Sequence, residues 1–127
     1  MEVTRVENVI KEYKVGQVIT QALRGVSLAI HDKEFTALVG PSGSGKTTLL
    51  QLIGCLDLPT SGKVYLNSKD VSTLSRDQRA DIRRGTIGFV FQFFALIPTL
   101  SAYENIELPM LLNHTSATTR AERVRHL

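Results

Sequence analysis

The chain has 127 residues, enough for one domain with a buried core of ordinary size. Its formal net charge of +3, with both signs interspersed along the chain, is too small to indicate a nucleic-acid partner. A single cysteine, Cys55, excludes an internal disulfide, and the three histidines are too scattered to form a metal site.

The first residues, 1–4, lack the basic start and apolar stretch of a signal peptide. No apolar run reaches the roughly 18–20 residues that a membrane-spanning helix needs. These features predict a cytoplasmic protein.

The first third of the chain is rich in Val, Ile, Leu and Thr in rough alternation, which predicts short antiparallel strands at 3–13, 18–23 and 25–30. A turn at 31–33 leads into the apolar segment Phe35–Val39, which we expect to be a buried strand. A second turn at 59–62 precedes a strand at 63–67. Residues 86–91 return to strand character.

A helix is expected to begin near Lys46, and three further helix starts carry the capping-box pattern, in which a Ser or Thr is followed three residues later by Glu or Gln. These boxes occupy residues 75–78, 101–104 and 119–122. The first of the three helices should end at Gly85, and the second should kink at Pro109. The third begins so close to residue 127 that it indicates an interrupted domain.

The segment 40–48 matches the phosphate-binding pattern G-x-x-x-x-G-K-[ST]. Its glycines allow backbone conformations closed to other residues, so that successive N–H groups can point at a polyphosphate near the start of a helix. Lys46 would reach the β- and γ-phosphates, and the Thr47 hydroxyl would bind Mg²⁺. The alternative is a Gly/Ser-rich turn that happens to contain a lysine, but the expected strand before it and helix after it favour nucleotide binding. The candidate nucleotide-binding residues here are Gly40, Ser42, Gly43, Ser44, Gly45, Lys46, Thr47 and Thr48.

Several ordered segments resemble the N-terminal half of an ABC-transporter ATP-binding subunit: Tyr13, residues 22–28, the phosphate loop, and residues 59–62 and 87–92. The continuation at 96–106 is most similar to the branch that serves lipoprotein release and macrolide export. The resemblance implies an α/β phosphate-loop NTPase fold of the ABC type, present incompletely. It divides the chain into a mainly β subdomain at 1–34, part of a RecA-like nucleotide-binding core at 35–92, and the Q-loop with the beginning of a helical subdomain at 93–127.

The resemblance also implies roles for residues outside the phosphate loop. Tyr13 would stack on adenine: a tyrosine in an early strand more often serves packing, but the place of Tyr13 relative to the phosphate loop favours stacking. Gln92 would contact Mg²⁺ and the γ-phosphate. The loop Phe93–Pro98 would receive a transmembrane permease, unless its apolar residues are ordinary core. ATP and Mg²⁺ are then the expected cofactors, a second ATP-binding subunit the expected head-to-tail partner, and the inner face of the cell membrane the expected location.

The sequence departs from the family pattern at Asp32-Lys33, where Gly-Glu is common, and at Ala95, where Asn is frequent in this branch. It contains no Leu-Ser-Gly-Gly-Gln signature, no apolar run ending in Asp-Glu, and no switch histidine. We therefore expect nucleotide binding without turnover by this chain alone, with no catalytic residue in it and with Lys46 and Gln92 assisting phosphate and Mg²⁺ handling.

Two other classes of protein are compatible with a phosphate loop. One is a different phosphate-loop enzyme such as a nucleotide kinase, but nothing in the sequence resembles a lid for a phosphate acceptor. The other is a nucleotide-binding or interaction module that does not hydrolyse ATP. We also expect marginal stability, because the strands at 35–39 and 86–91 would lack neighbours in the sheet.

Overall fold

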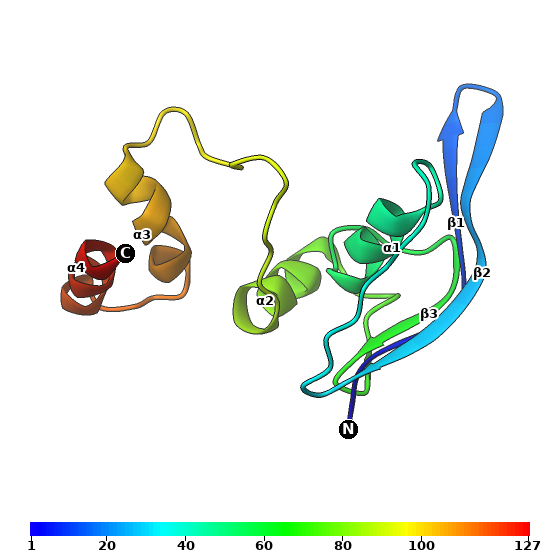
Figure 1. Ribbon diagram of the computed structural model, residues 1–127, viewed down its shortest axis with the longest axis horizontal. Coiled ribbons are helices and arrows are strands. Elements are labelled where there is room, and N and C mark those ends of the chain that lie inside the picture. Colours follow the sequence, from blue (N-terminus) through cyan, green and yellow to red (C-terminus); the bar gives the residue numbers. More distant parts are fainter. The chain divides into compact units, whose positions relative to one another are not determined.

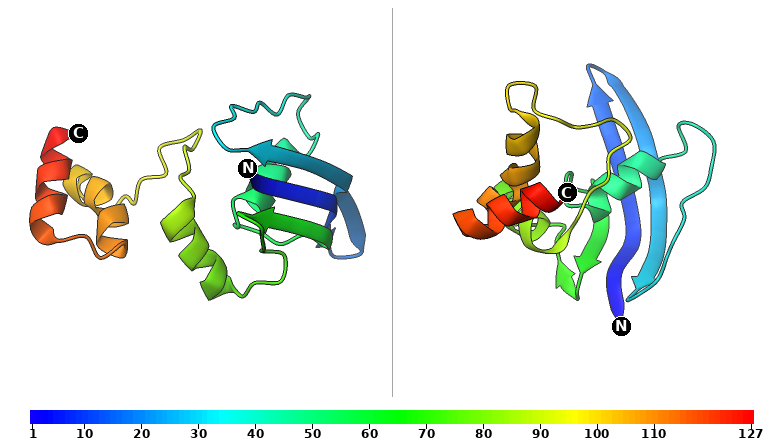
Figure 2. Two further views of the ribbon diagram at one scale, coloured as in Figure 1. Left: turned by 90° about the horizontal axis from the view of Figure 1, so that it is seen from below. Right: turned by 60° about the vertical axis from the view of Figure 1, so that its left-hand side comes forward.

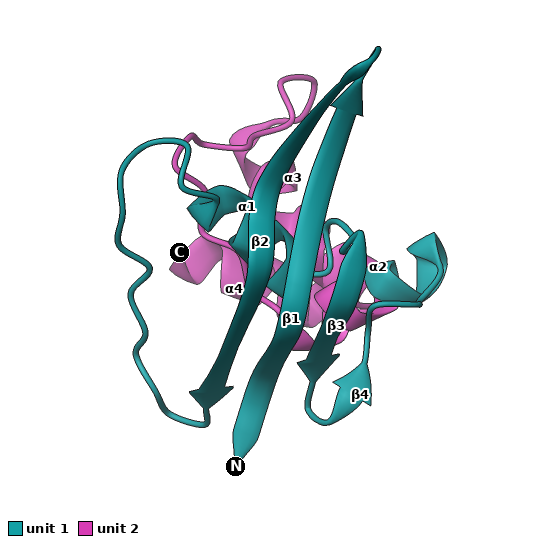
Figure 3. Ribbon diagram, turned by 90° about the vertical axis from the view of Figure 1, so that its right-hand side faces the viewer, with its two compact units in different colours: residues 1–80 teal, residues 81–127 magenta.

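The structure is a computed structural model that describes residues 1–127 and divides into two compact units, Met1–Ala80 and Asp81–Leu127 (Figure 3). The first unit contains β1 (Glu2–Val15), β2 (Val18–His31), α1 (Lys46–Ile53), β3 (Ser61–Leu66) and β4 (Lys69–Asp70). The helix α2 (Arg76–Thr86) crosses the boundary, and the second unit contains α3 (Ala102–Leu112) and α4 (Ala117–His126) (Figure 1).

The first unit is built on an antiparallel sheet with the strand order β2-β1-β3-β4. The two long strands form a hairpin, and the expected break at Gly25 is absent because pairing with β1 continues from Val26 to Arg24 across a register shift. A second shift lies at Asn8, whose φ of 47° marks a bulge. The predicted strands at 18–23 and 25–30 are therefore one strand.

The helix α1 packs against one face of this sheet (Figure 2). Its residues Leu49 and Leu52 are buried, and they meet the inward side chains of the strands because alternate residues of a strand point to the same face. The buried apolar residues of the unit are Val6, Val9, Leu23, Leu49, Leu52, Cys55, Val64, Leu66 and Val71.

The strands predicted at 35–39 and 86–91 are wrong. Residues 34–41 and 87–91 contain neither helix nor strand. Phe35 is 98% exposed and Val90 is fully exposed, so these apolar side chains have not found a core. The physical reason is hydrogen bonding: a strand exists only beside another strand, and neither segment pairs with the sheet of the first unit.

Two of the three predicted capping boxes are present. In α2, Ser75 and Gln78 exchange hydrogen bonds of 3.0 and 3.2 Å. In α3, Ser101 accepts from the Glu104 N–H at 3.2 Å and donates its own N–H to the Glu104 carboxylate at 2.7 Å.

The predicted turn at 59–62 is shorter than expected, because β3 already begins at residue 61.

The third box is wrong in position. Helix α4 begins at Ala117, and its N-cap is Ser116, whose hydroxyl accepts from the Thr119 N–H at 3.3 Å. Ser116 lies one turn earlier than Thr119 and takes the cap, so Thr119 is inside the first turn. Arg120 then joins α4 to α3 through a 2.7 Å ion pair with Glu107. None of the four helices combines the length and the apolar composition that a membrane-spanning helix requires.

Candidate nucleotide-binding site

The phosphate loop ends at Gly45, which is the N-cap of α1 with a left-handed backbone (φ 90°, ψ 2°). No side chain caps this helix, and its first internal bond runs from the Leu49 N–H to the Gly45 carbonyl at 2.8 Å. The N–H groups of the first turn precede that bond and have no partner within the helix. The start of α1 therefore offers backbone donors and the positive end of the helix dipole to an anion.

Gly45 is required by close contact as well as by its backbone angle. A Cβ atom at this position would lie 2.6 Å from the Ala22 carbonyl oxygen and 2.8 Å from Cδ2 of Leu23. Both residues belong to β2, so the strand lies in close contact with the loop at Gly45. Any larger residue would displace the loop from the sheet or strain its backbone.

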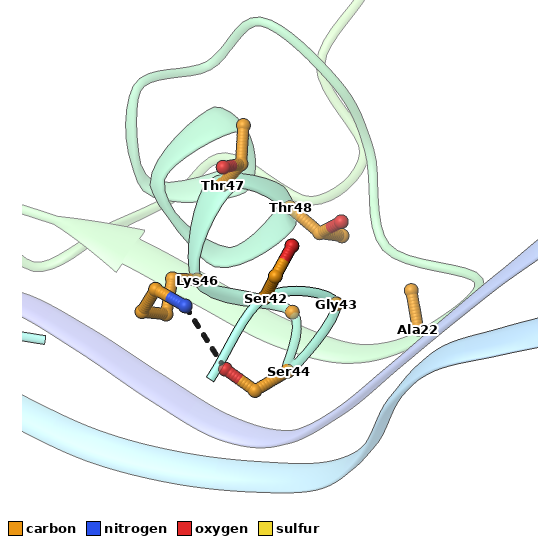
Figure 4. Close-up of a pocket in the computed structure, with 8 residues that line it drawn as sticks. Ala22, Ser42, Gly43, Ser44, Lys46, Thr47 and Thr48 are labelled. Carbon is orange, nitrogen blue, oxygen red and sulfur yellow. Dashed lines mark hydrogen bonds between the residues drawn. The ribbon is translucent and has the colours of Figure 1, made fainter. Parts of the chain in front are cut away.

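The Lys46 ammonium group is folded over the loop. It donates hydrogen bonds to the carbonyl oxygens of Gly40 and Pro41, at 2.8 and 2.7 Å. It also donates to the Ser44 hydroxyl at 3.2 Å (Figure 4). Three oxygens thus hold the one positive charge of the loop. A polyphosphate oxygen could replace these neutral acceptors and gain a charge-assisted bond.

A cavity of about 220 Å³ lies at this loop. Its lining contains one cation, Lys46, and no carboxylate, which favours an anionic ligand. Seven of the lining residues belong to the predicted motif, and the eighth, Ala22 of β2, was not predicted as a site residue. The lining residues are Ala22, Ser42, Gly43, Ser44, Gly45, Lys46, Thr47 and Thr48.

Tyr13 lies on β1 in the same unit, opposite Thr20 of β2. Its side chain is exposed, and the Lys11 ammonium nitrogen lies 5.0 Å from the centre of its ring. Lys11 also pairs with Asp57 at 2.7 Å, and the Tyr13 hydroxyl makes a long 3.4 Å contact with the same carboxylate. Sequence reasoning identified Tyr13 but missed Lys11 and Asp57, since two ordinary charges 46 positions apart carry no local signal.

Partial burial alone would raise the pKa of Asp57, but the hydrogen bond and charge of Lys11 and the Leu58 N–H outweigh it and lower that pKa. The carboxylate is therefore ionised at neutral pH, and the ion pair with Lys11 persists there.

Gln92 and the loop Phe93–Pro98 belong to the second unit. Gln92 is exposed in a segment without helix or strand, and its role at Mg²⁺ stays a prediction. The loop side chains Phe93 and Phe94 are also exposed, so they are not core residues in this chain. Asn105 of α3 orders the end of the loop: its side-chain oxygen accepts from the Ile97 N–H at 2.8 Å, and its amide donates to the carbonyl of Ile97 at 3.2 Å.

Together, the glycine-capped helix start, the folded lysine and the adjoining sheet define a phosphate-loop nucleotide-binding domain. The family model of the ABC transporter matches residues 23–127, and the chain belongs to this family, whose ATP-binding proteins it resembles. The predicted fold class is confirmed: an antiparallel sheet with helices forms part of an ABC ATP-binding fold.

Among curated relatives, the chain is 49% identical to an ABC transporter ATP-binding protein of Methanocaldococcus jannaschii, MJ0796, over 94% of its own length and 51% of the relative's. It is 46% identical to the macrolide export ATP-binding/permease protein MacB of Brucella abortus, over 97% of its own length and 19% of that protein. The chain thus spans about half, or less, of these relatives.

A solved structure of MJ0796, a dimeric post-hydrolysis state bound to ADP and Pi, superimposes with a TM-score of 0.90. The sequence identity is 46%, and the match covers 97% of this chain and 54% of the solved one.

Proposed function

We propose that this chain is part of the ATP-binding subunit of an ABC transporter and that its phosphate loop binds ATP together with Mg²⁺. The observation that carries the proposal is the geometry of Lys46, whose ammonium group lies over the loop beside the uncapped start of α1. The MJ0796 cassette bound to ADP and Pi, which is 46% identical, supports a nucleotide as the ligand.

The residues of the loop fit a Mg²⁺ ion that arrives with the nucleotide. Mg²⁺ prefers oxygen ligands and usually keeps several waters beside substrate phosphates. Thr47 lines the cavity, and its hydroxyl would supply one oxygen. The family resemblance implies Gln92 as a second ligand. No group of three or more His, Cys, Asp or Glu side chains in the structure could hold a metal by itself. The ion would therefore depend on phosphate oxygens, which agrees with a shared Mg·ATP ligand.

Hydrolysis needs a carboxylate that positions water in line with the γ-phosphate, in addition to charge stabilisation. Residues 1–127 provide the lysine and the backbone donors, and their sequence contains no Asp-Glu pair after an apolar run. We propose that these residues bind ATP without turning it over by themselves.

The proposed role further includes two protein partners. The exposed apolar side chains of the loop Phe93–Pro98 would contact a transmembrane permease, of the export or lipoprotein-release type, at the inner face of the membrane. The relative MacB carries ATP-binding and permease functions in one named protein, and the solved MJ0796 cassette is dimeric. These likenesses support a permease and a second ATP-binding subunit as partners.

The decisive test is nucleotide affinity with and without Lys46. Lys46→Ala should weaken Mg·ATP binding about tenfold to a hundredfold, because a charge-assisted hydrogen bond is lost. Equilibrium dialysis with labelled ATP measures this, and Lys63→Ala is the matched control, since Lys63 is an exposed lysine of β3 paired only loosely with Asp70 at 3.8 Å. Equal affinity in the wild type and in Lys46→Ala would overturn the proposal.

Turnover is tested separately by phosphate release from ATP. The wild-type chain and Lys46→Ala should both release phosphate at the background rate. Release that depends on Lys46 would show that residues 1–127 contain a complete hydrolytic site.

A further inference from the structure

We infer that Lys11 and Asp57 are positioning residues that hold the Tyr13 ring in place as a platform for the nucleotide base. This inference rests on the proposed nucleotide binding and adds two residues that the phosphate-loop motif does not contain. All three side chains belong to the first unit, as does the loop.

Lys11 is fixed by two oxygens that come from the segment after α1. Its ammonium group is 2.7 Å from the Asp57 carboxylate and donates to the Leu58 carbonyl at 2.7 Å. Its side chain is only 12% exposed, so both charges of the pair are partly removed from water. An exposed ion pair contributes little because its side chains stay mobile, but this lysine is bonded on two sides and nearly buried.

The same ammonium group lies over the Tyr13 ring, at 5.0 Å from its centre. An ammonium within about 6 Å of an aromatic ring is attracted to the ring face. The cation therefore occupies one face of the ring, and a base would stack on the other. The 3.4 Å contact of the Tyr13 hydroxyl with Asp57 places the edge of the ring beside the same carboxylate.

The position of the ring along the sheet suits a ligand that extends from the phosphate cavity. Tyr13 pairs with Thr20, and Ala22, two residues further along β2, lines that cavity. Two residues of a strand span roughly 7 Å. Phosphates at the loop and a base at Tyr13 would thus lie along one edge of β2.

Affinity for two ligands separates positioning of the base from binding of phosphates. ATP carries a base, whereas tripolyphosphate carries the same phosphate chain without one. In the full chain, Tyr13→Ala should weaken Mg·ATP binding about tenfold and leave Mg·tripolyphosphate unchanged, because stacking on the base is lost. Lys11→Met should weaken Mg·ATP about fivefold, again without changing tripolyphosphate.

Three further variants show whether Lys11 acts through Tyr13. Lys11→Met should have no additional effect in a Tyr13→Ala background, Lys11→Arg should retain most of the ATP affinity, and Asp57→Asn should reproduce part of the Lys11→Met loss. Lys63→Met is the matched control, since it removes an exposed lysine of the same sheet. Circular dichroism and a thermal melt of each variant identify any that fail to fold, and Asp57→Asn and Lys11→Arg then carry the test.

The inference is overturned if Lys11→Met weakens ATP and tripolyphosphate equally, if it leaves ATP binding unchanged, or if its effect persists without Tyr13. Failure of the proposed function looks different, because binding of both ligands would then be independent of Lys46. A loss restricted to ATP in Lys11→Met and Tyr13→Ala, alongside dependence of both ligands on Lys46, supports the inference.

Discussion

The antiparallel sheet and the segments 34–41 and 87–91 are both rich in large apolar residues, but only the sheet buries them. Val6, Val9 and Val64 of the sheet are at most 1% exposed, whereas Phe35 and Val90 are exposed almost completely. The difference lies in where each segment finds a hydrogen-bonding partner. A two-residue turn joins β1 to β2, whereas no strand of the chain pairs with the other two segments. An apolar, β-branched composition is therefore not sufficient for a strand, because the segment must also pair through hydrogen bonds with a neighbouring strand.

The largest change in stability is expected for a core substitution in α1, and it tests whether the packing of α1 on the sheet is what stabilises the chain. Leu52→Ala should lower the free energy of unfolding by about 2–5 kcal/mol, because it leaves a cavity where a side chain is 1% exposed. Urea unfolding followed by far-UV circular dichroism measures it.

Phe35→Ala is the matched control for the same experiment. It removes a larger side chain, but one that is 98% exposed, so the free energy of unfolding should change by less than about 0.5 kcal/mol. A cost of several kcal/mol at Phe35 would show that segment 34–41 is packed in solution, and the contrast between the two regions would then fail.

The same contrast explains how much of the fold the sequence could predict. Local signals were sufficient for α1 and for the caps at Ser75 and Ser101, because the groups that stabilise them lie within a few residues. They also predicted antiparallel strands in the first part of the chain, but not that β2 continues past Gly25, which depends on pairing with β1. They were insufficient at Phe35–Val39, where strand character is present but no partner is. At α4 the sequence predicted Thr119 as the N-cap, but the helix begins earlier and Ser116 is the N-cap.

A smaller effect is expected for the phosphate loop, which contacts β2 at Gly45. Gly45→Ala should cost about 2–3 kcal/mol, because the new Cβ would lie 2.6 Å from the Ala22 oxygen in addition to its strained φ of 90°. Gly16→Ala, at φ 61° in the hairpin turn with nothing within 4 Å, should cost only about 1 kcal/mol. Chemical denaturation of both variants gives the comparison. Equal costs would mean that contact with β2 does not constrain the phosphate loop.

For the candidate site too, local signals predicted the contiguous residues but not those that come from distant segments. The motif at 40–48 could be identified because its residues are contiguous in the sequence, and residues 42–48 line one cavity whereas Gly40 does not. Ala22 enters that cavity only because β2 passes the loop, and Lys11 meets Asp57 only because β1 lies beside the segment that follows α1. Such contacts depend on strand register, which the sequence pattern alone does not determine.

The smallest expected effect is the pH dependence of the link between β1 and the segment after α1. The pKa of Asp57 is lowered in the folded chain, because the Lys11 hydrogen bond and charge and the Leu58 N–H outweigh the opposing effect of burial. A lowered folded pKa means that the unfolded chain binds the proton more readily. The contribution to stability is therefore complete above the unfolded value of about 3.9 and declines as the pH falls from there through the folded value.

Because the Asp57 side chain is 36% exposed, solvent screening should limit this contribution to less than about 1 kcal/mol. The measurement is the difference in unfolding free energy between the wild type and Asp57→Asn at several pH values from 7 to 3. The difference should be constant down to about pH 5 and then shrink as the carboxylate is protonated. A difference that grows as the pH falls would mean that Asp57 is held in its neutral form, and the sheet would then not retain this segment through an ion pair.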